Sequence, residues 1–85
     1  MIVCEKQWEV YLVECLDGSM YTGVSNDVDL RMRNHASGRG SKYVRAKGFS
    51  KLLARKKCLN KSSACKAEYY VKQLPRDEKI KWFRN

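Results

Sequence analysis

The stretch that decides the fold is VYLVECLDGSMYTGVS, residues 10–25. Apolar and polar residues alternate on both sides of its central Asp-Gly pair. Alternation with a period of two is typical of β-strands, and Asp-Gly is typical of the turn between them. The sequence therefore predicts a hairpin with strands at 8–15 and 19–25.

The length of the turn decides which side chains share a face of this hairpin. A two-residue loop would place Tyr11 and Tyr21 on opposite faces, because a one-residue slip turns every side chain over. A three-residue loop, with Gly18 in the left-handed conformation, pairs Cys15 with Ser19 and puts both tyrosines on one face. It also gathers an apolar set on the opposite face, as a core requires: Trp8, Val10, Leu12, Met20, Thr22 and Val24. We therefore expect the three-residue loop and a shared, less apolar tyrosine face.

The rest of the chain predicts three helices and a third strand. Ser25 or Asn26 can cap a helix that ends at Gly38, with an inner stripe of Val28, Met32 and Ala36. Residues 49–55 predict a strand. Residues 62–74 predict a helix that Ser62 or Ser63 caps and whose inner face holds Ala64, Ala67, Val71 and Leu74, and a last helix follows at 75–85. We expect one α/β domain over residues 1–85, with a small three-stranded, mainly antiparallel sheet covered by helices.

The composition excludes several classes of protein. Eighty-five residues allow one modest core. No apolar run has the length of a membrane span, and the start of the chain lacks a signal-peptide pattern. The four cysteines form no CxxC pair and there is one histidine, so a standard zinc site is not expected. We interpret the cysteines as reduced thiols of an intracellular, cytoplasmic protein.

The charge of the chain is +9 and is unevenly distributed. Residues 38–57 carry eight lysines and arginines and no acid, with Tyr43 and Phe49 between them. A basic run with interleaved aromatic residues indicates a polyanion, most often nucleic acid, although a solvated surface gives the same composition. An anionic membrane is disfavoured, because no predicted helix has a wide apolar face.

One ordered set of residues carries a resemblance to a known family. Tyr11, the Tyr21-Thr22-Gly23 triplet, Arg31, His35 and a distant helical Glu68 occur at spacings similar to those of the GIY-YIG endonuclease domain. The likeness covers about residues 8–82 and is closest to small stand-alone GIY-YIG proteins, through the segments DGSMYTGVSND and GRGSKYVRA. The first motif departs from the family, with Glu9-Val10-Tyr11 in place of Gly-Ile-Tyr, and the second has threonine in place of isoleucine.

The resemblance implies metal-dependent hydrolysis of DNA phosphodiesters, with branched, flapped or damaged DNA as candidate substrates. Glu68 would hold Mg²⁺, with Mn²⁺ as an alternative. Tyr11 would act as general base or orient water, and positive charge would have to lower the phenol pKa for the base role. Tyr21 would orient water or phosphate, Arg31 would bind the scissile phosphate, and His35 would donate to the phosphate or move a proton. DNA would contact Gly23 and the basic residues Arg39, Lys42, Arg45, Lys47 and Lys51.

Simpler readings of the same residues stay open. Glu68 and Lys72 are spaced for an ion pair on the surface of one predicted helix. Asp27 and Arg31 are spaced for the same kind of pair on another. At the level of function, the alternatives are a non-catalytic nucleic-acid-binding module and a basic domain that docks on another protein. A chain this short also leaves room for a partner that supplies specificity. The oligomeric state is not predicted.

Overall fold

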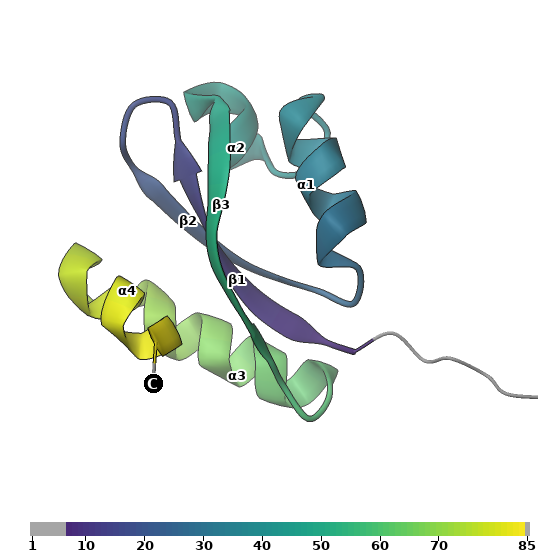
Figure 1. The fold of residues 1–85 in the computed structure, drawn as a ribbon, viewed down its shortest axis with the longest axis vertical. Coiled ribbons are helices and arrows are strands. Elements are labelled where there is room, and N and C mark those ends of the chain that lie inside the picture. The colour runs from purple at the N-terminus through teal and green to yellow at the C-terminus, as the bar shows by residue number, and fades with distance from the viewer. Residues whose placement is uncertain (1–6, 85) are drawn as a thin grey trace, which may run out of the picture.

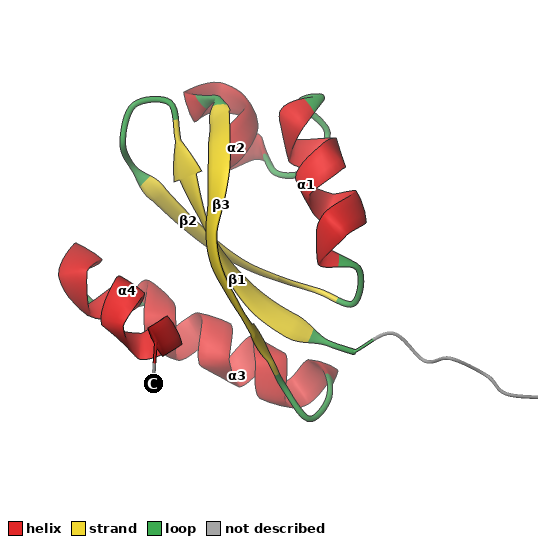
Figure 2. Cartoon of the chain, viewed as in Figure 1, coloured by secondary structure: helices red, strands yellow, loops and turns green. Residues whose placement is uncertain are grey.

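An antiparallel sheet with strand order β2-β1-β3 forms the centre of the computed structural model, which describes residues 7–84. Its strands are β1 (Glu9–Cys15), β2 (Met20–Ser25) and β3 (Phe49–Lys57). The helices are α1 (Val28–Ala36), α2 (Lys42–Lys47), α3 (Lys61–Lys72) and α4 (Arg76–Arg84). Helices α1 and α2 lie on one side of the sheet and α3 and α4 on the other (Figure 1), with the loops at its ends (Figure 2). The predicted fold class is confirmed.

The hairpin has the predicted three-residue loop. The Cys15 N–H donates to the Ser19 carbonyl at 2.8 Å, and Gly18 has a φ of 85°. In the resulting register Tyr11 lies opposite Gly23, and Val13 lies opposite Tyr21. Both tyrosines are therefore on the same face of the sheet, as the apolar pattern predicts.

The tyrosine face is as deeply covered as the opposite one, which the alternation pattern did not indicate. Tyr11 and Val13 are fully buried, and they pack in one cluster with Val28 of α1 and Val44 of α2. Val10 and Leu12 on the opposite face are also fully buried. Because β1 is the central strand and helices lie on both sides of it, both of its faces are covered along most of its length, and only Glu14 is partly exposed.

Helix α1 differs from its prediction at both ends. Its N-cap is Asp27, whose Oδ1 accepts from the Leu30 N–H at 3.2 Å, so the expected cap at Ser25 or Asn26 is wrong. The inner stripe continues from Val28 to the buried His35, while the expected Ala36 is exposed. At 100° per residue, a step of seven residues returns to within about 20° of the same side, whereas a step of eight is rotated by about 80°.

The later elements show three further differences. Asn60 caps α3 by accepting from the Ser63 N–H at 2.8 Å, in place of the expected Ser62 or Ser63. Strand β3 continues two residues beyond its predicted end, to Lys57. The short helix α2 was not predicted; Ser41 caps it, and Gly48 ends it at a φ of 83°. The predicted inner face of α3 is confirmed, since Ala64 and Val71 are buried and Ala67 and Leu74 are half-buried.

Three of the four cysteines lie in the described part of the chain. The thiols of Cys15, Cys58 and Cys65 are free, and Cys4 lies outside the described residues. Within residues 7–84, no helix is long and apolar enough to cross a bilayer.

Arg55 ties three elements together. Its Nε and Nη2 donate to the two oxygens of Glu9 at 2.9 and 2.7 Å, and its Nη1 donates to Asp29 of α1 at 3.2 Å. The Glu9 side chain is only 9% exposed, so this bidentate pair neutralises a carboxylate that water hardly reaches. Arg55 belongs to the basic run, but in this structure it has a structural role.

We predict that Arg55→Gln lowers the free energy of unfolding by about 1–3 kcal/mol, because it leaves the Glu9 carboxylate without its guanidinium partner. Urea denaturation of Arg55→Gln, Glu9→Gln and the double variant measures the coupling directly. The free energy of unfolding should fall less in the double variant than the sum of its falls in the two single variants. Additive losses would show that the pair contributes nothing to stability.

Candidate active site

A buried hydrogen bond joins the centre of the sheet to helix α1. The Tyr11 hydroxyl lies 2.9 Å from Nε2 of His35, and the two residues are 0% and 2% exposed. Their rings meet edge to face with centroids 5.8 Å apart. Two polar side chains from distant parts of the chain are thus held together where water is nearly excluded.

Two glycines make room for this pair. A Cβ on Gly23, directly opposite Tyr11, would lie 2.5 Å from the Tyr11 hydroxyl oxygen and 3.0 Å from the Tyr21 ring. A Cβ on Gly40 would collide with the His35 ring at Nδ1. Gly23 was expected to allow close approach of DNA; in this structure it allows close approach of Tyr11. Gly40 was not predicted, although it stands in a short segment with two glycines and two serines.

Three further aromatic rings surround the pair. The Tyr21 ring lies 6.4 Å from Tyr11 and 5.8 Å from His35, measured between centroids. Tyr43 of α2 stacks on Tyr21 at 5.9 Å, and Phe49 of β3 stacks on His35 at 6.2 Å. Tyr43 and Phe49 were noted as aromatic residues of the basic run, but their place beside the site was not predicted. The one sequence signal for their position was the interleaving of aromatic and basic residues.

The environment holds both partners in their neutral forms at pH 7. Burial, reinforced by the Tyr21 phenol, raises the pKa of Tyr11 well above its usual value of 10, although the charge and hydrogen bonding of Arg31 act to lower it. Burial, and then the Arg31 charge, hold the pKa of His35 below its usual 6.5. The positive charge expected to lower the Tyr11 pKa is present, but burial outweighs it.

Helix α3 brings a carboxylate and an ammonium group to the same region. Glu68 is half-buried, and its charge acts on the Tyr11 hydroxyl. Lys72 Nζ lies 3.3 Å from a Glu68 oxygen and 5.8 Å from the centre of the Tyr21 ring. The ion pair that residue type alone favoured is therefore present, and it lies beside the other candidate residues.

The donor set restricts the kind of metal that could bind here. Within residues 7–84, no group of three or more His, Cys, Asp or Glu side chains could hold an ion. A single carboxylate such as Glu68 suits Mg²⁺, which keeps several waters and completes its shell with substrate phosphate oxygens. It does not suit zinc, which takes three or four protein ligands. The residues present thus fit a weakly held Mg²⁺ or Mn²⁺.

The predicted DNA-binding residues have different surroundings. Arg39, Lys42 and Arg45 line a hollow of about 320 Å³ together with Gly38, Gly40 and Ser41. Lys47 pairs with Asp17 at 3.2 Å, and its Nζ lies 5.8 Å from the centre of the Tyr43 ring. Lys51 is exposed on β3. Three of the five cations thus share one surface next to Gly40, which packs on His35.

Comparisons with known proteins identify the family of the chain. The family model described as GIY-YIG catalytic domain matches residues 7–81. The chain is 46% identical over 77 residues to a UPF0213 protein of Oceanobacillus iheyensis, covering 91% of this chain and 90% of that one. It is 41% identical over 76 residues to a UPF0213 protein of Cupriavidus pinatubonensis, covering 89% and 84%. The solution NMR structure of the UPF0213 protein BH0048 from Bacillus halodurans is similar, with a TM-score of 0.54 and 45% identity over 89% of this chain and 81% of that one.

The lowered pKa of His35 predicts how stability depends on pH. Below pH 6.5 the unfolded chain binds a proton more readily than the folded chain, so the free energy of unfolding falls as the pH falls. The slope cannot exceed ~1.4 kcal/mol per pH unit for one proton. His35 is the chain's one histidine. We therefore expect His35→Gln to be less stable than wild type at pH 7, with a free energy of unfolding that hardly changes from pH 7 to pH 5. Urea denaturation checks this, and equal slopes in both proteins would refute it.

Proposed function

Because the chain belongs to the GIY-YIG catalytic domain family, we propose that it is a metal-dependent endonuclease that hydrolyses phosphodiester bonds of DNA. The observation that supports this best is the buried contact between the Tyr11 hydroxyl and a neutral His35, next to Arg31 and Glu68. Buried, perturbed titratable groups gathered from separate elements are typical of active sites. Five family positions, on two strands and two helices, converge here.

Tyr11 and His35 provide a path for the proton of the attacking water. In this reaction neutral His35 accepts the Tyr11 hydroxyl proton at Nε2, which requires the tautomer that carries its own proton on the buried Nδ1. As a water oxygen bonds to phosphorus, its proton passes to the Tyr11 oxygen while the Tyr11 proton passes to Nε2. The P–O bond to the leaving oxygen breaks, and that oxygen takes a proton from solvent. No tyrosinate has to form first, which agrees with the raised pKa of Tyr11.

Arg31 and Tyr21 act on the phosphate and the water. The Arg31 guanidinium offers a planar set of donors to a phosphate oxygen, and it lies close enough to influence both Tyr11 and His35. When the proton reaches His35, two positive groups stand side by side, and the dianionic transition state at phosphorus stabilises both. Tyr21, half-buried and in contact with both rings, holds the water or a phosphate oxygen with its hydroxyl.

Glu68 is the residue that would hold the metal ion. Bound there, Mg²⁺ or Mn²⁺ would act as a Lewis acid that neutralises charge on the phosphate and the leaving oxygen. Lys72 neutralises the Glu68 carboxylate at 3.3 Å. We propose that Lys72 releases Glu68 when DNA arrives and then faces a phosphate instead. The hollow with Arg39, Lys42 and Arg45 holds flanking phosphates.

A non-catalytic nucleic-acid-binding module is the second candidate. The observation that favours it is the same Glu68–Lys72 pair, which gives the carboxylate a purely structural partner. On that reading the basic surface still binds DNA, but the site holds no metal. The two candidates differ in what Glu68 does.

Glu68→Gln distinguishes them, because it keeps the shape of the side chain and removes the charge that holds the ion. We predict a loss of cleavage of about 100-fold or more, weaker Mg²⁺ binding, and DNA affinity unchanged or slightly raised. Cleavage is measured on duplex, flap, bubble, junction and single-stranded DNA with Mg²⁺, Mn²⁺ or EDTA. Mg²⁺ binding is measured by calorimetry.

Glu78→Gln is the matched control, since Glu78 forms an (i, i+3) pair with Lys81 at 3.6 Å on α4. It should change stability by a few tenths of a kcal/mol and leave cleavage unchanged. Equal cutting by wild type and Glu68→Gln would remove Glu68 from the site. Binding without cutting by the wild-type protein, under every metal condition, would establish the non-catalytic module.

A further inference from the structure

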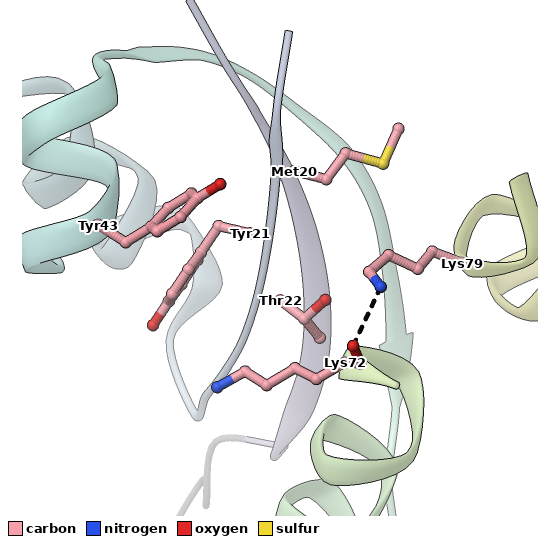
Figure 3. Close-up of a pocket in the computed structure, with 6 residues that line it drawn as sticks. All are labelled: Met20, Tyr21, Thr22, Tyr43, Lys72 and Lys79. Carbon is pink, nitrogen blue, oxygen red and sulfur yellow. Dashed lines mark hydrogen bonds between the residues drawn. The ribbon is translucent and has the colours of Figure 1, made fainter. Parts of the chain in front are cut away.

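A second hollow lies at the free edge of strand β2, next to the candidate active site. It has a volume of about 310 Å³, at the lower end of the range for small-molecule sites. Figure 3 shows its lining on both sides of the strand, with Lys72 reaching across below: Met20, Tyr21, Thr22, Tyr43, Lys72 and Lys79. Of these residues, the proposed reaction uses only Tyr21 and Lys72.

The hollow contains a buried polar atom without a partner. Thr22 is 2% exposed, and its Oγ1 finds no hydrogen-bond partner within residues 7–84. Burying a hydroxyl without a hydrogen bond is unfavourable, so such atoms in a hollow indicate that a bound group supplies the partner. Valine has nearly the same shape as threonine and would fit at position 22 without changing the strand.

The backbone of β2 offers further hydrogen-bonding groups at the same place. Strand order β2-β1-β3 makes β2 an edge strand. The Cys15 N–H donates to the Ser19 carbonyl, so in the alternating antiparallel ladder the pairs of Met20 and Thr22 with β1 are the ones that lack ladder bonds. The N–H and C=O groups of Met20 and Thr22 therefore point away from β1, toward the hollow.

The remaining lining residues combine aromatic surface with positive charge. Tyr43 is 41% exposed although it stacks on Tyr21, so part of its ring is open to a ligand. Lys72 Nζ lies over the Tyr21 ring. Lys79 Nζ donates to the carbonyls of Lys72 and Leu74, which leaves one of its three N–H groups for a ligand.

We propose that this hollow binds the base of an unpaired nucleotide next to the scissile phosphate; the assignment rests on the proposed nuclease function. The base stacks on the tyrosine surface, as bases do in proteins that bind single strands. Its polar edge hydrogen-bonds to Thr22 Oγ1 and to the backbone of β2. Lys72 and Lys79 face the phosphates of the bound strand. A base inside a duplex is already stacked and paired, and it cannot enter.

The charge of the lining favours a nucleotide over a peptide strand added to the edge of β2. Added strands take backbone hydrogen bonds and use apolar pockets for alternate side chains. Here two ammonium groups flank the strand: Lys72 pairs with Glu68 of α3, which lies outside the lining, and the lining itself holds no carboxylate. The tyrosine rings match the face of a base, the Thr22 hydroxyl matches its polar edge, and the two ammonium groups match the phosphates of the nucleotide.

The test compares DNA binding by wild type, Thr22→Val and Tyr43→Leu in EDTA, so that cleavage does not interfere. Fluorescence anisotropy gives Kd for a single-stranded oligonucleotide, the same oligonucleotide with abasic sites throughout, and its blunt duplex. We expect Thr22→Val to weaken binding to the base-containing strand roughly fivefold and Tyr43→Leu roughly tenfold. Binding to the abasic strand and the duplex should change by less than about twofold. Tyr69→Leu, which removes a tyrosine that is 73% exposed on α3 and outside the hollow, is the matched control.

The outcomes separate this proposal from the nuclease proposal. Thr22→Val should unfold at the same temperature as wild type or higher, so weaker binding cannot be ascribed to loss of the fold. Unchanged affinity for the base-containing strand, or an equal loss on all three DNAs, would overturn the base site while leaving the nuclease proposal intact. A wild-type protein that binds none of the DNAs at low salt would overturn both.

Discussion

The hydrogen bond between Tyr11 and His35 is the constraint on which the rest of the site depends. It holds a phenol on the central strand against an imidazole on α1, and both groups are almost wholly buried. The neighbouring residues are restricted accordingly: glycine is required opposite Tyr11 at Gly23 and beside the imidazole at Gly40. Burial also keeps both groups neutral, which is the state in which a proton can pass from one to the other.

The edge position of β2 explains how residues from both sides of the sheet reach one site. Helix α1 and helix α3 lie on opposite sides of the sheet (Figure 1). Helix α1 presents His35 and Arg31 to Tyr11, while α3 brings Glu68 and Lys72 to the Tyr21 ring from the other side. A central strand at this place would block that approach. The same free edge carries the hollow around Thr22, so the proposed reaction and the proposed base site depend on one feature of the sheet topology.

The sequence predicted what short-range patterns control. Alternation and Gly18 were enough for the hairpin register, and spacing was enough to bring Tyr11 and His35 into one family pattern. It could not predict that burial would outweigh Arg31 at the Tyr11 hydroxyl, because burial depends on helices packed from far along the chain. The stacking of Tyr43 on Tyr21 depends on α2, a helix too short to leave a periodic signal.

The most direct test of the account is the single-turnover rate of DNA cleavage by Tyr11→Phe, measured with Mg²⁺ on the substrate that wild type cuts fastest. The variant keeps the ring over Gly23 and loses only the hydroxyl. We predict a fall of about 100-fold or more with an unchanged circular dichroism spectrum. Tyr70→Phe, on the exposed side of α3, should cut like wild type. A folded Tyr11→Phe that cuts at the wild-type rate would contradict the central claim that the Tyr11–His35 contact carries the proton.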